Sequence, residues 1–195
     1  SYLWVWGDTL VGNVTVSGHR NIRKMVHDSF SIADVNESFI KHFIPNTTSG
    51  FLKPIPTSSP SYYWVVAGIL IEKLFFVCMT IEQTNSSIGF RQVSSDIVII
   101  DNFQHGKFHP PSEWLYRSQN IPNSKNSNCT WNEGIVVADI NGEPINSQGN
   151  NFGDGIYVYI LGKCVWSTNS GAALSRIRKQ DLLQFSSFTN NSKSK

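Results

Sequence analysis

The side chains of this sequence that could do chemistry are acidic groups near the ends of apolar, strand-like runs. Asp8 follows the run Tyr2–Trp6 and Gly7. A carboxylate held at the end of an extended strand can act as an acid or a base toward a bound molecule. His27 lies next to one further acidic residue and could orient a carboxylate. The acidic candidates are Asp8, Asp28, Asp34 and Glu133.

Each of these residues also has an ordinary structural interpretation. Asp8 could form a turn by accepting hydrogen bonds from nearby backbone amides. Asp34 could cap a loop, and Asp28 could be exposed. Glu133 could be a solvated loop residue, and a lone histidine in a strand, such as His27, is more often structural. The sequence leaves both interpretations open.

Aromatic side chains near these carboxylates could bind a sugar, because a ring face packs against the apolar C–H face of a pyranose or furanose. Neighbouring Asn and Asp side chains would then bind the hydroxyls. Large aromatic residues also dominate core packing, so we expect most of the candidates in the core and one or two at a ligand. The candidates are Trp6, Tyr63, Trp64 and Trp131.

Other chemistries have little support in the sequence. His105 and His109 have an i, i+4 spacing, but Gly106 and Pro110 oppose the helix that would align them on a metal. We find no nucleophile elbow, phosphate loop, dinucleotide fingerprint or Cys-x-x-Cys motif, so no cofactor or metal is expected. The net charge of +2 is spread along the chain, which makes nucleic acid an unexpected partner.

The elements that must position these residues are β-strands. The chain has 195 residues, of which 40% are hydrophobic, enough for a sizeable core. Helical periodicity is confined to 173–185, which fits the start of a strand equally well. The fold class is therefore all-β. Short runs of β-branched and aromatic residues predict strands at 2–6, 26–32, 62–66, 74–82, 90–93, 96–100, 131–138, 156–161 and 172–177.

A Trp shortly ahead of a Gly recurs at Trp6, Trp64 and Trp131. Spacings of about 60 and 67 residues each suit one antiparallel four-stranded blade of a β-propeller with long loops. Chance similarity in an aromatic-rich chain is the alternative explanation. We assign residues 1–185 to about three blades and residues 186–195 to a polar tail. A propeller needs at least four blades, so another chain or a missing segment is expected to complete the ring.

Composition suits a secreted protein. Charged residues make up only 15% of the chain, and serine and asparagine together outnumber them. The longest apolar run, 62–81, is split by Glu72 and Lys73 and is too short on either side to span a bilayer. No signal peptide is recognised at Ser1, so we expect the chain to be processed or incomplete. Candidate N-glycosylation sites are Asn13, Asn36, Asn46, Asn85, Asn128 and Asn190, although accidental sequons are the alternative.

The cysteines indicate the same compartment. If the two apolar runs between Cys129 and Cys164 pair as an antiparallel hairpin with Ala138 opposite Ile156, the two thiols lie side by side at its open end. That places them within disulfide reach and predicts an oxidising, extracellular environment. Cys78 lies in an apolar run and is predicted to be a buried free thiol.

Five segments together resemble a known family. They are 4–12 (Trp-Val-Trp-Gly-Asp-Thr-Leu-Val-Gly), 25–29 (Met-Val-His-Asp-Ser), 62–64 (Tyr-Tyr-Trp), 154–159 and 174–177. In this order they resemble the secreted five-bladed β-propeller domains related to glycoside hydrolases, including the endo-D-arabinanase type. The opening Trp-Gly-Asp-Thr is the most distinctive of these motifs.

The resemblance implies a funnel in which carboxylates from different blades meet around a sugar. Asp8 and either Asp28 or Asp34 would form the carboxylate pair, and Glu133 would be a third acidic group. One carboxylate would protonate the leaving oxygen while the other attacks the anomeric carbon or activates water. Related propellers commonly have Asp where this chain has Ala67, which leaves that constellation incomplete.

Two functions therefore follow from the sequence. The first is an extracellular carbohydrate-active propeller of glycoside-hydrolase type that binds, and if active hydrolyses, a polysaccharide. The second is a non-catalytic secreted glycoprotein, structural or glycan-binding, with a degenerate propeller site. A polysaccharide or another glycan is the expected partner in the first case.

Overall fold

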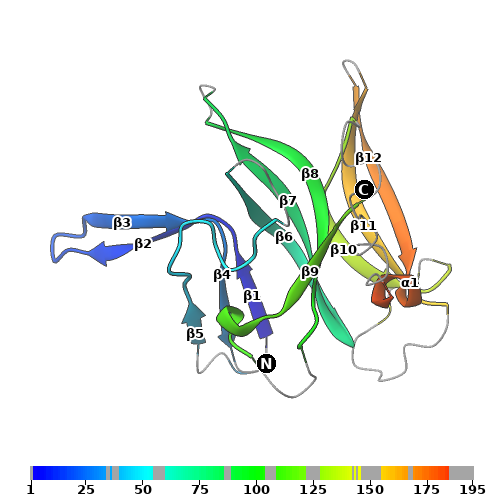
Figure 1. Ribbon diagram of the computed structural model, residues 1–195, viewed down its shortest axis with the longest axis horizontal. Helices are drawn as coiled ribbons and strands as arrows, with labels where there is room; N and C mark the ends of the chain where they lie inside the picture. The colour runs from blue at the N-terminus through cyan, green and yellow to red at the C-terminus, as the bar shows by residue number, and fades with distance from the viewer. Residues whose placement is uncertain are drawn as a thin grey trace, which may run out of the picture.

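The computed structural model describes almost only β-structure, arranged as three antiparallel sheets and one projecting hairpin (Figure 1). The expected all-β class is confirmed. This described part of the chain holds no helix with the length and apolar character that crossing a membrane would require. The described residues are 2–33, 36, 40–54, 60–85, 89–103, 109–121, 128–141, 143, 145, 155–166 and 169–184.

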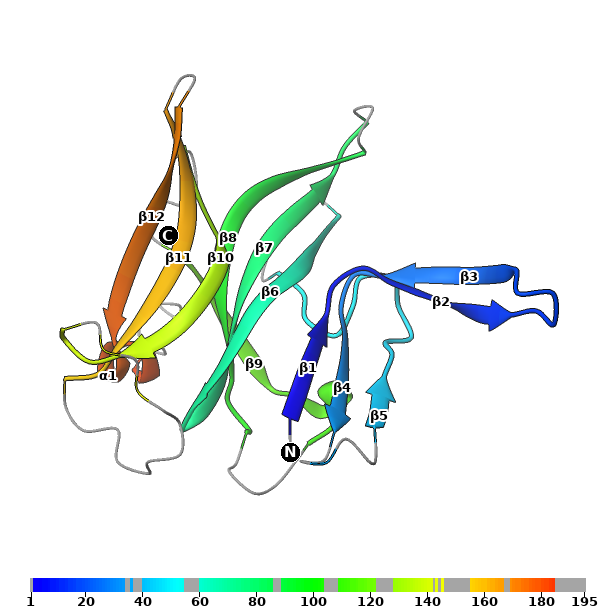
Figure 2. The same cartoon turned by 180° about the vertical axis from the view of Figure 1, so that it is seen from behind.

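The first sheet has the strand order β1–β4–β5. β1 (Tyr2–Trp6) pairs with β4 (Ser29–Ala33), and β4 pairs with β5 (Ile40–Phe43). Between β1 and β4 the chain forms a hairpin of β2 (Thr9–Val14) and β3 (Arg20–Val26). This hairpin, which we call the arm, projects from the body of the protein (Figures 1 and 2).

The central sheet is a four-stranded meander in the order β6–β7–β8–β9. Its strands are β6 (Ser61–Ile71), β7 (Lys73–Gln83), β8 (Phe90–Ile100) and β9 (Tyr116–Asn120), and the short 3-10 helix η1 (Pro111–Glu113) precedes β9. β7 and the second half of β8 are buried on both faces. Their nearly continuous apolar runs are typical of strands enclosed between other layers.

The third sheet has the order β10–β11–β12. Its strands are β10 (Cys129–Ala138), β11 (Tyr157–Trp166) and β12 (Asn169–Arg178). A single helical turn, α1 (Lys179–Leu183), follows β12 directly. The segment for which the sequence left strand and helix open is therefore a strand that ends in this turn.

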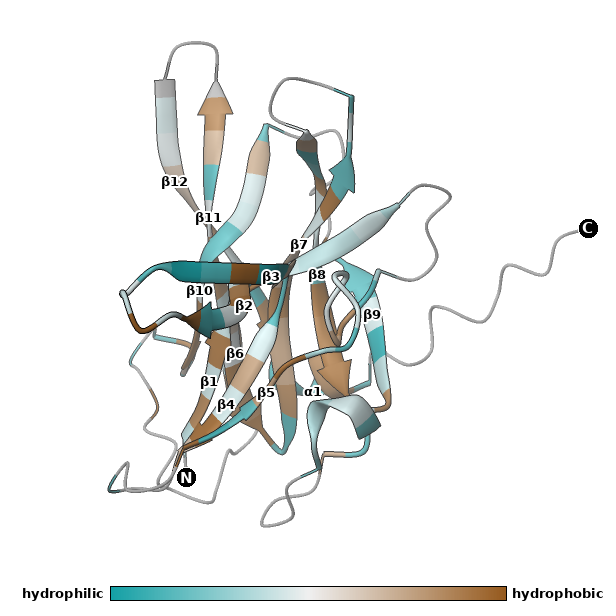
Figure 3. Ribbon diagram, turned by 90° about the vertical axis from the view of Figure 1, so that its left-hand side faces the viewer, coloured by the Kyte–Doolittle hydropathy of each residue, from teal (hydrophilic) through white to brown (hydrophobic). Residues whose placement is uncertain are grey.

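The three sheets stand side by side in chain order, and their first strands are neighbours. β6 contacts both β1 and β10 (Figure 2). One core, built around Phe30 and Phe76, joins the first sheet to the central sheet. A second core, built around Phe75 and Val158, joins the central sheet to the third. Figure 3 shows the apolar stretches in brown on the strands of these sheets. Removing this apolar surface from water is what holds the sheets together.

A buried carboxylate ties the central sheet together. Asp96 on β8 accepts hydrogen bonds from one side chain on each of the other three strands: Tyr63 on β6, Thr80 on β7 and Asn120 on β9. These donors replace the water that the carboxylate loses on burial. Burial and the charge of Asp96 raise the pKa of Tyr63. Cys78 is paired with Asp96 across β7 and β8 and is the expected buried free thiol.

Several strand boundaries differ from those expected. The run 26–32 is interrupted at His27 and Asp28, so that β3 ends before them and β4 begins after them. The runs 90–93 and 96–100 form one strand, β8, because the two serines between them are buried within the sheet. The sequence did not predict β2, β5 and β9 at all, or β3 before residue 26, since these segments are short or rich in polar residues.

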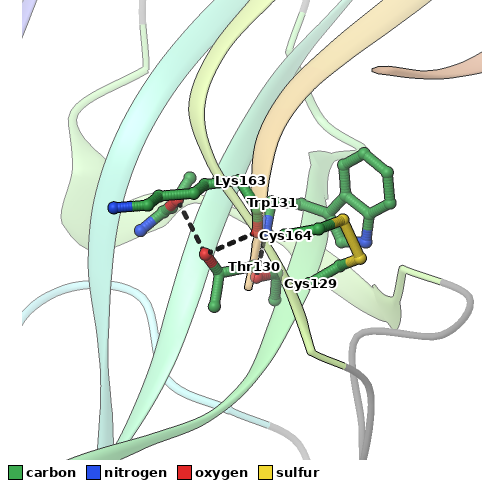
Figure 4. Close-up of a disulfide and its surroundings, with 7 residues drawn as sticks. Cys129, Thr130, Trp131, Lys163 and Cys164 are labelled. Carbon is green, nitrogen blue, oxygen red and sulfur yellow. Dashed lines mark hydrogen bonds between the residues drawn. A yellow bond between two sulfur atoms is a disulfide. The ribbon is translucent and has the colours of Figure 1, made fainter. Parts of the chain in front are cut away.

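The predicted disulfide is confirmed. Cys129 and Cys164 are directly paired across β10 and β11 and are bonded to each other (Figure 4). Ala138 is opposite Tyr157 rather than Ile156. An irregularity in the pairing of β10, between Ala138 and the open end of the hairpin, shifts the register and brings the cysteines opposite each other. The register shift lies between Thr130 and Gly134 and is typical of a β-bulge.

Each Trp of the repeat lies on the strand that begins a sheet: Trp6 on β1, Trp64 on β6 and Trp131 on β10. Within the described residues none of the sheets closes on itself. The polar tail assigned to residues 186–195 lies outside the described residues.

Candidate functional site

Asp8 lies at a bend in one long ribbon, in which β1 leads into β2 and β3 leads into β4. The pairing of β1 with β4 ends at Trp6, which is opposite Ser29. Beyond the bend, β2 and β3 pair in the same register, beginning with Thr9 opposite Val26. Asp8 and His27 therefore stand opposite each other at the step where regular pairing is interrupted. The bend turns both side chains toward β6 of the neighbouring sheet.

One oxygen of the Asp8 carboxylate is fixed by two N–H groups. Oδ1 lies 2.9 Å from His27 Nδ1 and accepts a hydrogen bond of 2.8 Å from Trp64 Nε1. No hydrogen bond to Oδ2 is present within the described residues, and the Asp8 side chain is 38% exposed. An ionised carboxylate only accepts hydrogen bonds, so His27 carries hydrogen on Nδ1 when it faces ionised Asp8. The result is an oriented carboxylate with one free oxygen.

Two aromatic residues of β6 complete this group. The His27 ring stacks on Tyr62, with ring centroids 3.5 Å apart and an interplanar angle of 9°. Burial raises the pKa of Tyr62, and the negative charge of Asp8 raises it further. Side chains two apart on a strand point to the same face, so β6 delivers Tyr62 and Trp64 together. We call Asp8, His27, Tyr62 and Trp64 the Asp8 cluster.

Asp28 points away from this cluster into the interior. It is completely buried, and its two oxygens accept hydrogen bonds from the backbone N–H groups of Phe51 (2.6 Å) and Leu52 (3.1 Å). Burial raises its pKa from 3.8 to about 6, while these two backbone hydrogen bonds and the nearby His27 act in the opposite direction. In this position Asp28 holds the 51–52 backbone and does not face the exposed oxygen of Asp8.

Asp8 also lines an open hollow of about 510 Å³. The hollow is bounded by the bend, the arm and the ends of β4 and β5, and its polar and aromatic lining comes from Trp6, Asp8, Thr9, Arg20, Ser29, His42 and Phe43. Thr9 and Ser29 hydroxyls are hydrogen-bonded at 2.8 Å. Trp6 is 44% exposed and stacks in parallel with Trp4, with centroids 6.0 Å apart.

A buried serine connects the two rings of the hollow. Trp6 Nε1 donates to Ser31 Oγ at 2.7 Å, and Ser31 Oγ lies 2.6 Å from His42 Nδ1. Ser31 Oγ accepts from Trp6 and can still donate its own hydrogen to His42 Nδ1 or accept a hydrogen from it. His42 carries hydrogen on Nε2 when Ser31 donates or when the imidazole is protonated.

The remaining predicted residues lie elsewhere. Tyr63 and Trp131 are core residues: Tyr63 is completely buried against Asp96, and Trp131 belongs to the core between the central and third sheets. Glu133 is exposed on β10 and, within the described chain, makes no hydrogen bond or ion pair. Asp34 lies outside the described residues.

The remaining residues singled out in the sequence are the two histidines of the possible metal pair and the sequon asparagines. His109 is 3.7 Å from Glu113 and His105 lies outside the described residues. No cluster of potential metal ligands occurs among the residues that the structure describes. Asn190 also lies outside them, whereas the other five sequon asparagines are exposed, namely Asn13, Asn36, Asn46, Asn85 and Asn128.

Sequence reasoning missed most of the hollow. Arg20 and His42 lie on β3 and β5, and neither residue stands near a recognisable motif. The signal that could have indicated the hollow is the alternation Ser29, Ser31, Ala33, which places small residues on one face of β4. Small residues on a central strand leave room between the larger side chains of its two neighbours.

Comparisons of the chain with protein-family models, with curated proteins and with solved structures found no match.

Proposed function

We propose that this protein is an extracellular carbohydrate-active module of glycoside-hydrolase type that binds a polysaccharide at the hollow beside Asp8. The observation that carries the proposal is the Asp8 carboxylate, whose Oδ1 is held by His27 and Trp64 while Oδ2 is free. A fixed carboxylate with an exposed oxygen suits a sugar hydroxyl, because hydrogen bonds to charged groups are the stronger kind. The exposed face of Trp6 supplies a surface for the apolar side of a sugar ring.

Binding is supported better than hydrolysis. Glycoside cleavage ordinarily uses two carboxylates about 5–9.5 Å apart. Asp28 is buried and engaged with backbone amides, and the place where the related family commonly has Asp is occupied by Ala67. A catalytic partner for Asp8 would have to come from Asp34, from Glu133 or from a further part of the protein. Glycan binding without cleavage is therefore the second candidate function.

We also propose that the sheets are blades of an incomplete five-bladed propeller. The contacts of β6 with β1 and β10 support this arrangement, because the innermost strands of propeller blades surround a common axis. The outward face of the third sheet carries exposed apolar residues, including Leu161 and Leu174. This face is suited to packing against a further sheet from another segment or another chain.

The disulfide between Cys129 and Cys164 supports an extracellular location, since such bonds persist in oxidising compartments. The exposed sequon asparagines are compatible with glycosylation there.

The proposal is tested with Asp8→Asn and a panel of plant, microbial and animal polysaccharides. Binding is measured by calorimetry and cleavage by the release of reducing ends. Loss of one charged hydrogen bond, worth about 1.5–3 kcal/mol, should weaken binding about ten- to a hundredfold and abolish any cleavage. Asp181→Asn on α1 removes the same charge far along the chain and should bind as the unaltered protein does. Absence of glycan binding, or equal binding by Asp8→Asn, would refute the proposal.

A further inference from the structure

The charges around the hollow are not balanced. Asp8 stands at the bend, where two N–H groups already meet its Oδ1. Arg20 and His42 line the hollow from the arm and from β5. The arm carries Arg20, Arg23 and Lys24 and no acidic residue, and β3 is mostly hydrophilic in Figure 3. Lys24 is engaged, since its Nζ donates to the Pro45 carbonyl at 2.7 Å.

Arg20 has no acidic partner in the described part of the chain. Arg91, Arg117 and Arg178, by contrast, each pair with a carboxylate. A guanidinium that faces a hollow and is not engaged by the protein is available to a ligand. Its planar fork matches a carboxylate with two parallel hydrogen bonds.

His42 also lines the hollow, from β5. Its Nδ1 is occupied by Ser31, which is itself completely buried and held by Trp6. When Ser31 donates to Nδ1, or when the imidazole is protonated, a hydrogen on Nε2 is left for a ligand. Ser31 therefore links the side chains of Trp6 and His42, so that an indole ring and an imidazole line the hollow together.

Asp8 determines how a charged ligand would be oriented. A negative group close to its free oxygen would be repelled, whereas hydroxyl groups would be accepted. A sugar with one acidic substituent is accommodated if that substituent points toward Arg20 and His42 while neutral hydroxyls meet Asp8. A neutral sugar would leave Arg20 without a partner.

We propose that the hollow selects glycans that contain uronic acids, with the sugar carboxylate bound by Arg20 and by His42 Nε2–H and the sugar ring placed against Trp6. The inference rests on the proposed glycan-binding function and specifies the substrate class of that site. Arg20 acts as the residue that determines specificity, and Asp8 as the residue that determines orientation.

The test measures binding of oligosaccharides of galacturonate, of alginate and of hyaluronan, each beside its methyl ester, at 150 mM salt so that general attraction to the basic arm is screened. We expect at least one free acid to bind ten times or more as tightly as its ester. Arg20→Gln should lose that preference, so that the free acid binds no more tightly than the ester. Arg23→Gln removes the same charge from the same strand outside the lining of the hollow and should keep it.

Three results would overturn the inference. Equal binding of acids and esters, or binding of neutral glycans alone, would refute uronate selection and leave the proposed function standing. Equal weakening by Arg20→Gln and Arg23→Gln, together with comparable binding of dextran sulfate, would indicate general attraction to polyanions. Binding of no glycan at all, neutral or acidic, would refute the proposed function as well.

Discussion

Asp28 offers the sharpest test of the structure, because its burial makes the stability of the protein depend on pH in an unusual direction. The pKa of Asp28 rises from 3.8 to about 6 on folding, chiefly through loss of water around the carboxylate. A tenfold change in proton affinity corresponds to about 1.4 kcal/mol. The rise in the pKa of Asp28 therefore means that ionising this side chain lowers the stability of the folded protein by about 3 kcal/mol.

The direction in which stability changes with pH follows from proton linkage. Between about pH 4 and pH 6 the folded protein binds more protons at Asp28 than the unfolded chain does. Its contribution to stability is thus fully present below pH 4 and is lost as the pH rises through about 6. Ordinary paired carboxylates behave in the opposite way. Lys73 and Arg117 outweigh the effect of burial and lower the pKa of Asp101, so that residue adds stability above its unfolded pKa.

Asp28→Asn isolates the effect, because asparagine has a similar shape and does not ionise. We expect the free energy of unfolding of the unaltered protein, measured by urea denaturation, to fall by about 3 kcal/mol relative to Asp28→Asn between pH 4 and pH 7. Asp101→Asn should show a difference of the opposite sign. A pH-independent difference for Asp28→Asn would show that the two backbone hydrogen bonds balance burial, and a gain for the unaltered protein at higher pH would show that they outweigh it.

Two further predictions concern the glycine beside Asp28 and the disulfide of the third sheet. Gly50 has a φ of +88°, and a Cβ there would lie 2.4 Å from Asp28 Oδ2, whereas Gly89 has a φ of +75° and open space around it. We expect Gly89→Ala to lower the stability measured by thermal denaturation by about 1–2 kcal/mol and Gly50→Ala to lower it more. Equal losses of stability would contradict the close approach of Gly50 to Asp28. The Cys129–Cys164 disulfide closes a sequence separation of 35 residues, so replacing both cysteines by serine should lower stability by about 4 kcal/mol; an unchanged denaturant midpoint would contradict this.

The sequence could predict features that depend on local pattern. Continuous apolar runs indicated β7 and β10, and the pairing of two such runs located the disulfide. The position of Asp8 after an apolar strand also indicated an exposed carboxylate at a strand end. The two-residue period of a strand could have separated Tyr63, which faces the core, from Trp64, which faces Asp8.

The sequence could not predict features that depend on distant segments. The strand predicted over 26–32 includes His27, whereas the bend there follows from the pairing of β1 with β4 and of β2 with β3. Burial of Asp28 is possible only because the amides of Phe51 and Leu52 reach it. His42 lines the hollow because the short strand β5 pairs with β4 and places it opposite the buried Ser31.

The Asp8 cluster and the interior are connected through two adjacent residues. Neighbouring side chains in extended chain face opposite sides, so His27 turns to Asp8 while Asp28 turns to the 51–52 backbone. The His27 amide also donates to Thr48 at 3.2 Å, so the same loop holds the corner at both residues. A change that displaces this loop must therefore alter the angle at which His27 meets Asp8. Asp28 thus helps to hold the corner that carries His27, from the interior side of the first sheet.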